Sequence, residues 1–503
     1  MAIFILRRFF ISTFTLLLAS FVVYVGTALS GDPLEDLYGI QDEGDAAIQQ
    51  AARRELLQLD TPIPLRYLSW LGGVLRGDFG TNIRGQDVSA LLSTAAAATL
   101  KMVIVATILA IVFGVTIGII SALRQYSGFD YTLTFAAFLF FSLPIFWVAV
   151  MLKQYAAIEF NNWLADPTIS TPVILAIAAV SAVAWMGILG GDAQRRITTV
   201  IVSFATTAGI LTFFSATQWF ADPAFGTTVV LALSVSSAAA ATFLTAGFRH
   251  RPPLVAALVT AGIGFAFYLA SEPILGDASA WILLGLFLVS VAVGLGVGAA
   301  LGGLQRRQAM SASVLTAALV GGVIFTDYML RSYASYAEAV RGRPVSTVGS
   351  VTPGFSGNFW EVGLDSIGHL LLPTLALLLI SFAVYTRYTR SSMLEVMNQD
   401  YIRTARAKGL TERTVVMRHG FRNALIPVTT LVAFDFGAVI GGAVITEQVF
   451  GWQGMGFLFI NGLNAVDPNP VMAFFVVAGG SIVIFNMLAD IAYAYLDPRI
   501  RLS

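Results

Sequence analysis

The sequence contains no cysteine, and this absence excludes disulfide bonds, thiolate metal sites and a cysteine nucleophile. Histidine is scarce too: His250, His369 and His419 are too few and too scattered for a metal cage, so each is expected to be structural. The 29 basic residues balance the 29 acidic ones, and a net charge of zero gives no global field that would attract nucleic acid. A nucleic-acid partner and a bound metal are therefore not expected.

Catalytic motifs are missing as well. No G-x-x-x-x-G-K-[ST] sequence occurs, so the chain has no phosphate-binding loop of that kind for ATP. Neither a Ser/His/Asp set nor a pair of carboxylates stands in a plausible site. We therefore expect a chain that is not an enzyme by itself and binds no cofactor of its own.

Hydrophobic residues are abundant in the sequence, and many of them stand in long apolar runs. Hydrophobic residues make up 57% and charged residues only 12%, and the mean hydropathy is +0.79. Apolar runs of about 20 residues, the length that crosses a bilayer as a helix, recur along the chain. The first run, Phe9 to Leu29, is longer than the apolar region of a signal peptide, so this helix is expected to be retained. The fold class is therefore all-α, a polytopic bundle of about twelve transmembrane helices near 9–29, 98–120, 131–155, 171–190, 197–219, 227–247, 254–271, 281–303, 312–330, 366–386, 425–446 and 471–495.

Basic residues fall on alternate connections between these runs. With Arg7 and Arg8 inside, the alternation puts the later basic clusters in the cytosol, as the positive-inside rule requires. The long segment 30–97 then lies outside, and its arginines are tolerated because long loops translocate largely regardless of charge. The sequence thus predicts a multi-pass cell-membrane protein, surrounded by membrane lipid, with both termini in the cytosol.

A polar, basic block interrupts the apolar runs between Ser391 and Pro427. Its charged side chains cannot lie in hydrocarbon, where each would cost roughly 2.5–3.5 kcal/mol at the bilayer centre. The block is therefore expected to be a cytosolic loop that opens with a short docking helix. Glycine at 409 would permit the helix to end, small residues would allow a partner to come close, and cations could pair with a partner's carboxylates. The candidate coupling residues are Asp400, Tyr401, Arg403, Thr404, Ala405, Arg406, Ala407, Lys408, Gly409 and Leu410.

This block resembles the signature of the permease subunits of dipeptide, oligopeptide and nickel ABC importers. The resemblance extends to about 1–155 and 346–503 through LDTPIPLRYLSWLGGVLRGDFGTNIR, FSLPIFWVAVML, TPGFSG, ITEQVFGWQGMG and LADIAYAYLDPRIR. It implies an ATP-driven importer in which two ABC ATPase subunits bind ATP and magnesium. It also implies a second, similar permease subunit and a soluble substrate-binding protein that delivers the ligand to the outer loops. The ATPases would dock on the cytosolic loop.

The loop departs from the broader ABC importer signature in two ways. Arg403 occupies a position that is usually acidic, and Pro427 follows Gly409 by 18 residues instead of 13. The longer spacing resembles the peptide and nickel branch. A dipeptide or oligopeptide is therefore the expected substrate, with nickel or another small solute as the alternative. An ion-coupled secondary transporter is a more remote alternative, because charge within the apolar runs is sparse.

The resemblance also divides the chain. The predicted domains are a first half of the permease core at 1–156, an inserted membrane region of three helical hairpins at 157–345, and a second half at 346–503 with the coupling loop at 391–424. The inserted helices have no counterpart in the usual permease of six helices. Because they are rich in small residues and poor in central charge, we expect a peripheral bundle that packs on the core by van der Waals contact.

Two further sets of candidates concern the path of the substrate. The segment Thr446 to Gly456 contains an acid, two aromatic residues and three glycines, and this composition predicts a mobile outer loop. Glu447, Phe450 and Trp452 are expected to close the outer mouth or to contact the docked binding protein. The pathway candidates are Ser142, Pro144, Phe146 and Asp435. Pro144 could kink a pathway helix, although an ordinary packing kink and, for Asp435, an interhelical polar contact remain open.

Overall fold

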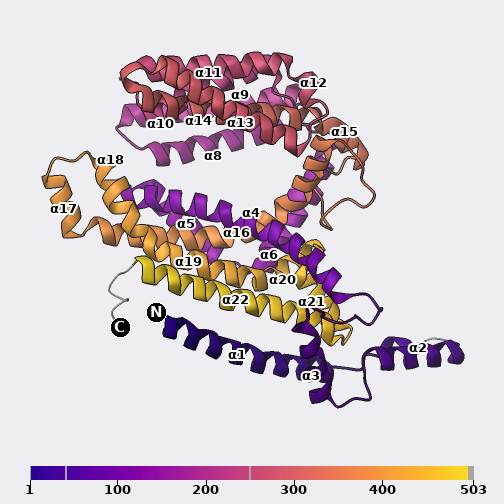
Figure 1. The fold of residues 1–503 in the computed structure, drawn as a ribbon. Coiled ribbons are helices and arrows are strands. Elements are labelled where there is room, and N and C mark those ends of the chain that lie inside the picture. Colours follow the sequence, from indigo (N-terminus) through magenta and orange to yellow (C-terminus); the bar gives the residue numbers. More distant parts are fainter. Residues whose placement is uncertain (1, 40–41, 249–250, 497–503) are drawn as a thin grey trace.

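The computed structural model describes residues 2–39, 42–248 and 251–496. Helices form almost all of it, and among these residues the only β pairing is an isolated bridge between Thr81 and Asp87. The helices lie in layers, with the sequence-central helices α8 to α14 on one side and the N-terminal helix α1 on the other (Figure 1). The expected all-α, polytopic architecture is confirmed.

Ten helices in the described residues are long and apolar enough to cross a bilayer, and a bent pair makes up to eleven. The pair consists of α5 (Gly128–Ser142) and the segment Ile145–Leu164, which meet at 103°. The one remaining expected span, 425–446, falls on α19 (Phe421–Gly442), and several side chains of this helix lie outside the described set. The ten are α1 (Ala2–Leu29), α4 (Val88–Leu123), α8 (Thr171–Leu189), α9 (Ala193–Ala216), α10 (Gly226–Thr245), α11 (Arg251–Ala270), α13 (Ala280–Leu301), α14 (Arg306–Arg331), α16 (Phe359–Met397) and α22 (Pro468–Leu496).

Shorter helices connect these spans. Their ends are set by side chains that satisfy free backbone groups: Asp87 accepts from the amides of Ser89 and Ala90 at the start of α4, and Asn358 forms a capping box with Glu361 at the start of α16. The shorter elements are η1 (Glu35–Leu37), α2 (Glu43–Leu56), α3 (Ile63–Val74), α6 (Ile145–Met151), η2 (Leu152–Glu159), α7 (Phe160–Leu164), α12 (Glu272–Leu275), η3 (Gly303–Gln305), α15 (Tyr333–Ala339), α17 (Asp400–Ala407), α18 (Glu412–Thr414), η4 (Val415–Gly420), α20 (Val444–Phe450) and α21 (Met455–Asn464).

The two halves of the predicted core meet mainly where α4 packs along α16 (Figure 1). Two glycines four residues apart on α4 make this possible. A Cβ on Gly114 would lie 2.6 Å from Cβ of Tyr385, and one on Gly118 would lie 2.8 Å from the carbonyl oxygen of Thr386. Small residues at this spacing let membrane helices approach with their backbones close together, so α4 and α16 are expected to move as one unit.

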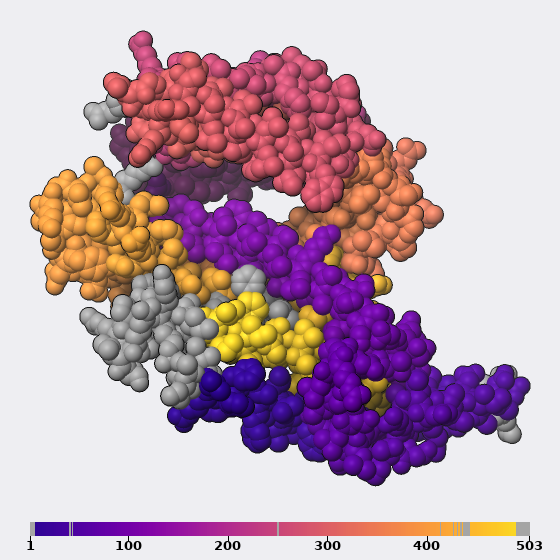
Figure 2. Space-filling view, in the orientation of Figure 1, coloured from indigo at the N-terminus to yellow at the C-terminus, as the bar shows by residue number. Residues whose placement is uncertain are grey.

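Among the central helices, α8 packs with α9, and α14 packs with α10, α11 and α13. Contacts with the rest of the chain are concentrated at the ends of this group, where α8 meets α5 and α14 leads through α15 to α16. The space-filling view shows an open gap between this group and the layer that contains α4 (Figure 2). The group therefore lies beside the remaining helices instead of mixing with them.

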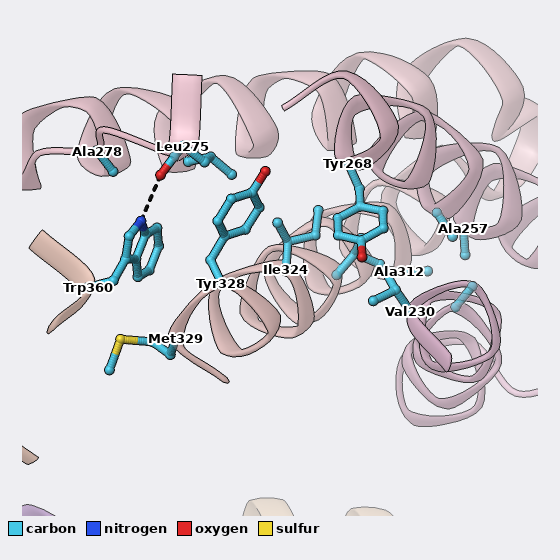
Figure 3. Packing of buried hydrophobic residues seen from close by; sticks show 13 residues of the cluster. Val230, Ala257, Tyr268, Leu275, Ala278, Ala312, Ile324, Tyr328, Met329 and Trp360 are labelled. Carbon is cyan, nitrogen blue, oxygen red and sulfur yellow. Dashed lines mark hydrogen bonds between the residues drawn. The ribbon is translucent and has the colours of Figure 1, made fainter. Parts of the chain in front are cut away.

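One cluster anchors the central helices to α16. Trp360, at the start of α16, has only 1% of its surface exposed and belongs to a buried cluster with Leu275, Ile324 and Tyr328. Its indole Nε1 donates a 2.7 Å hydrogen bond to the carbonyl oxygen of Leu275 (Figure 3). The expected van der Waals packing is therefore supplemented by a directional bond.

Candidate functional site

The candidate coupling helix α17 projects from one end of the molecule, next to α18 (Figure 1). It has one inner face: Ile402 is fully buried and Ala405 is 6% exposed, and both pack with Val415. The other candidate residues of the helix and of the turn that follows are exposed. An exposed helix held from behind by its own loop is suited to docking against a second protein.

Ala405 differs from its expected role. Its side chain lies against Val415 within the loop, so its small size serves the packing of the loop itself rather than a close approach on the open face. Helix geometry gives the reason, because positions 402 and 405 lie three residues apart and share one face. The exposed surface is formed instead by Tyr401, Arg403 and the remaining candidates.

Charge on the coupling loop is partly neutralised within the loop. The Arg406 guanidinium donates to both carboxylate oxygens of Glu412, at 2.7 Å from Nη2 and 3.2 Å from Nε. This hydrogen bonding lowers the pKa of Glu412 and raises that of Arg406. Arg403 lies 3.4 Å from Asp400 in an ion pair that is largely exposed, and such pairs are weak. Among the candidate coupling residues, Arg403 and Lys408 are thus the cations most available to a partner.

Gly409 ends the coupling helix in a conformation that favours glycine. Its φ is +75°, and its amide donates to the carbonyl oxygen of Arg406 at 2.9 Å. A Cβ at this position would meet no atom within 4 Å, so the constraint comes from the backbone angle and not from crowding. The expected helix end at this residue is present.

A charge pair that the sequence did not reveal lies behind the coupling loop. Arg390 of α16 donates to Asp130 of α5 through Nε at 2.7 Å and Nη2 at 2.8 Å. Asp130 is 2% exposed and also accepts from the hydroxyl of Ser121. An acid just before the predicted helix 131–155 and a base just after the predicted helix 366–386 were the only signals available, and nothing in their positions indicated that they meet.

The candidate outer gate forms a buried hairpin. The side chain of Glu447 on α20 is fully buried; Oε1 accepts from the hydroxyl of Thr99 at 2.6 Å, and Oε2 from the amide of Phe457 at 3.0 Å. Glu447 lies outside the ten candidate spans. Its burial is the main reason that its pKa is raised to about 7. A Cβ on Gly454 would come within 2.3 Å of this carboxylate. The glycine therefore permits a close contact.

This arrangement differs from the expected mobile loop. Phe450 is 2% exposed and Trp452 is 1% exposed, and the indole of Trp452 donates to the carbonyl oxygen of Ala98 at 3.1 Å. Side chains so deeply buried are not available to a docked binding protein in this structure. The physical reason is that the glycines allow the hairpin to pack tightly on α4, whereas their number alone suggested flexibility.

Three of the pathway candidates lie at the bend between α5 and α6. Ser142 ends α5, and Pro144 caps α6 with extended backbone angles, φ −62° and ψ 134°. Proline restricts the residue before it and has no amide hydrogen, so a helix cannot continue through this point. Phe146 is 54% exposed just beyond it. The bend thus separates two apolar helices and exposes an aromatic side chain beside it.

The fourth pathway candidate, Asp435, lies apart from this bend. It accepts a 2.8 Å hydrogen bond from the hydroxyl of Tyr385, which is 1% exposed on α16. This is the interhelical polar contact that the sequence left open. Among the described residues, no three His, Asp or Glu side chains gather as metal ligands would.

Comparisons with known proteins agree with this arrangement. Residues 114–502 match the model of the family described as "Binding-protein-dependent transport system inner membrane component". The oligopeptide transport system permease protein OppB of Mycobacterium bovis is 27% identical over 488 residues, which cover 97% of this chain and 95% of that relative. AppB of Bacillus subtilis, named an oligopeptide transport system permease protein, is 27% identical over an alignment of 509 positions that covers all of both chains.

A third relative matches a shorter stretch at a higher sequence identity. The dipeptide transport system permease protein DppB of Escherichia coli is 43% identical over 148 residues, which are 29% of this chain and 42% of the relative. The same stretch is a larger share of the relative, so the relative is the shorter protein. Because the family model covers most of the residues, including the helices around the coupling loop, the chain belongs to the family of binding-protein-dependent transport system inner membrane components.

Proposed function

We propose that this chain is the membrane-spanning permease subunit of an ATP-driven ABC importer of dipeptides or oligopeptides. The observation that carries the proposal is the similarity over 97% of the chain to a relative named as an oligopeptide permease. The exposed helix α17 supports it, because a translocation subunit without a nucleotide-binding motif of its own needs a surface on which an ATPase can act.

The proposed assembly contains two ABC ATPase subunits, a second similar permease subunit and a soluble substrate-binding protein. ATP and magnesium bind in the ATPase subunits. These dock on the surface that includes Arg403, Lys408 and Leu410, while the binding protein docks on the opposite side. The start of α1 lies toward the same end of the molecule as α17 (Figure 1), and this supports a cytosolic N-terminus. The C-terminus is proposed to be cytosolic as well.

The proposed mechanism transmits ATPase movement along α16. This helix runs without interruption for 39 residues, roughly 58 Å, and ends three residues before α17 begins. Movement of α17 would turn α16, and the Arg390–Asp130 pair would carry that movement to α5. Beyond α5 the chain bends at Pro144. A change of angle at this bend would rearrange the helices that line the proposed pathway. Alternate opening of the two sides follows from such rocking of packed helices.

The central helices are proposed to be an insertion peripheral to the pathway. Two hydrogen bonds join the proposed borders. The side-chain nitrogen of Asn161 donates to the carbonyl oxygen of Val345 at 2.8 Å, and the side-chain oxygen of Asn161 accepts from the backbone amide of Val345 at 3.2 Å. Residues 184 positions apart are thus joined directly, as expected if the intervening segment leaves and rejoins a common core. The shorter length of the Escherichia coli relative also supports an insertion.

Uptake by the reconstituted complex tests this proposal. Proteoliposomes with the chain, its partner permease, the ATPases and the binding protein should accumulate a labelled tripeptide when ATP is supplied on the side of α17. The same vesicles with hydrolysis-deficient ATPase subunits provide the control. Accumulation of Ni²⁺ without peptide uptake would favour the small-solute alternative. Peptide uptake driven by an ion gradient without ATP would contradict the ABC mechanism.

A further inference from the structure

A cavity of about 450 Å³ lies among the central helices. Its walls come from α11, α13 and α14, and Leu275 and Trp360 line it as well. Figure 3 shows these two residues joined by the indole hydrogen bond, with Ile324 of the lining nearby. The volume is within the range of small-molecule sites in proteins, so the cavity is larger than an ordinary packing defect.

The lining is apolar in its chemistry. Its two hydroxyl side chains, Thr260 and Ser290, donate to carbonyl oxygens of their own helices, at 2.9 Å to Ala256 and 2.8 Å to Phe287. They therefore offer no unpaired donor to an occupant. The other lining residues are aliphatic, aromatic or glycine. Since such a cavity offers water no partners, a molecule that binds in it has to present apolar groups.

The depth of the cavity corresponds to one leaflet of a bilayer. On α13 the lining residues run from Leu283 to Val293 along one face, and ten residues of helix rise about 15 Å. This is half of the roughly 30 Å thickness of the hydrocarbon core. Just before the first of them, Trp281 is 81% exposed, and tryptophan is enriched at the headgroup level. The cavity thus begins below the interface and ends near the bilayer centre.

A single unbranched hydrocarbon chain satisfies the depth and the lining chemistry of this cavity together.

We infer that this cavity binds one acyl chain of a membrane phospholipid from the leaflet beside Trp281. In the orientation proposed above this is the outer leaflet, but the site itself does not depend on the transport function. Glycines keep it open: a Cβ on Gly321 or Gly322 would meet no atom within 4 Å, and both residues line the cavity. The bound chain would fill the space between α13 and α14 and stabilise the central helices against one another.

Photocrosslinking tests this site. The full chain is assembled in vesicles of phosphatidylethanolamine and phosphatidylglycerol, with a phospholipid that carries a diazirine midway along one acyl chain. After illumination, crosslinked peptides should concentrate on 283–293 and 317–325. Gly321→Leu, which places a side chain in the cavity, should lower their yield at least fivefold. Gly285→Leu is the matched control, because Gly285 has the same open space around it as Gly321 but lies on α13 and does not line the cavity.

The result is interpretable even if one variant fails to fold. Ala318→Leu narrows the same cavity from another position and should give the same loss. If crosslinks spread evenly over the exposed face of α9 as well, and neither variant changes their yield, the lipids are only annular and the site is overturned. Recovery of a non-lipid hydrophobic molecule from the purified chain, at one per chain, would also overturn it.

Discussion

The guanidinium of Arg390 faces the carboxylate of Asp130 across 260 positions of sequence and donates two hydrogen bonds to it, at 2.7 and 2.8 Å. Asp130 lies at the beginning of α5 and Arg390 in the last third of α16. This two-point contact fixes distance and orientation at once, which a single point charge would not do. It thus provides a rigid link between the helix that leads to α17 and the helix that leads to the Pro144 bend.

Removing one member of this pair is expected to be costly. Asp130→Ala leaves a partly buried guanidinium without its acid and should reduce the free energy of unfolding by about 3–5 kcal/mol. Asp130→Leu combined with Arg390→Met removes both charges and should cost much less. Thermal unfolding of the wild type, Asp130→Leu, Arg390→Met and the double variant measures the coupling. Arg403→Ala is the control, because its exposed pair with Asp400 should contribute less than about 1 kcal/mol. If the losses of the two single variants add up to the loss of the double variant, the pair is not coupled.

Sequence patterns predicted the helices well because bilayer thickness imposes a length and a hydropathy that can be read directly. They predicted the polar loop that contains α17 for a similar reason, since charged residues cannot remain in hydrocarbon. Contacts between distant segments were not predictable in this way. Glu447 meets Thr99 across 348 positions, and Asp130 meets Arg390 across 260. Periodicity describes one helix at a time and carries no information on which helices become neighbours.

Glycine shows why composition was ambiguous at the candidate gate. The same absence of a Cβ permits mobility and permits tight packing. Around Glu447 the second property dominates, because Gly454 and Gly456 lie so close to α20 that a side chain at either would collide with it. At Gly409, by contrast, space is open and the backbone angle is the reason for glycine. Only the positions of neighbouring atoms distinguish these two cases.

Gly409→Val is expected to uncouple the importer. A β-branched residue at φ +75° is strained by roughly 1–3 kcal/mol, so the turn after α17 should shift even though the site is not crowded. Peptide uptake by the assembled complex should fall below about a fifth of the wild-type rate while ATP hydrolysis persists. Gly409→Asn is the matched control, since asparagine tolerates the left-handed region, and should retain most uptake. Unimpaired uptake by the valine variant at normal expression would contradict the coupling role.

Trp452→Ala is expected to loosen the contact between α4 and the α20–α21 hairpin. The indole packs with Met102, Val103 and Leu377 and bonds to Ala98, so truncation should cost about 3–5 kcal/mol. Basal ATP hydrolysis of the complex should rise, or its stimulation by the binding protein should weaken. Trp452→Phe keeps most of the packing and loses a hydrogen bond of about 1 kcal/mol, so it should behave much more like the wild type. If a well-folded alanine variant keeps both rates, the hairpin is a connector and not a gate.

Asp467 should make stability depend on pH. It is 1% exposed and accepts from the amide of Ile83 at 2.7 Å, and burial raises its pKa from 3.8 to about 6. The folded state therefore holds this proton more tightly than the unfolded state. The contribution of this proton to the free energy of unfolding is complete below pH 3.8 and is lost as pH rises through about 6. Between pH 5 and pH 7 the free energy of unfolding should therefore fall by about 1 kcal/mol.

Thermal unfolding between pH 5 and pH 7 measures this contribution. Wild type should become less stable as pH rises, and Asp467→Asn should show a shallower dependence even if its overall stability is lower. Glu447 titrates in the same direction, so the difference between the two slopes is the informative quantity. Parallel slopes for wild type and variant would exclude Asp467 as a titrating group in this range.

Removal of the central helices tests whether they are peripheral. Replacing Asp166 to Leu330 with a short Gly/Ser linker keeps α7, α15 and the Asn161–Val345 bonds, and it removes an even number of spans. The shortened protein should insert and retain part of its peptide uptake. Trp360 loses the cluster that buries it, but tryptophan is well accommodated at a membrane interface, so this exposure is expected to cost little. Adding Asn161→Ala to the deletion should sharply reduce the yield of folded protein, because the two ends then lack their direct bond. A shortened protein that is well folded and assembles with its ATPases but transports nothing would place the central helices in the pathway itself.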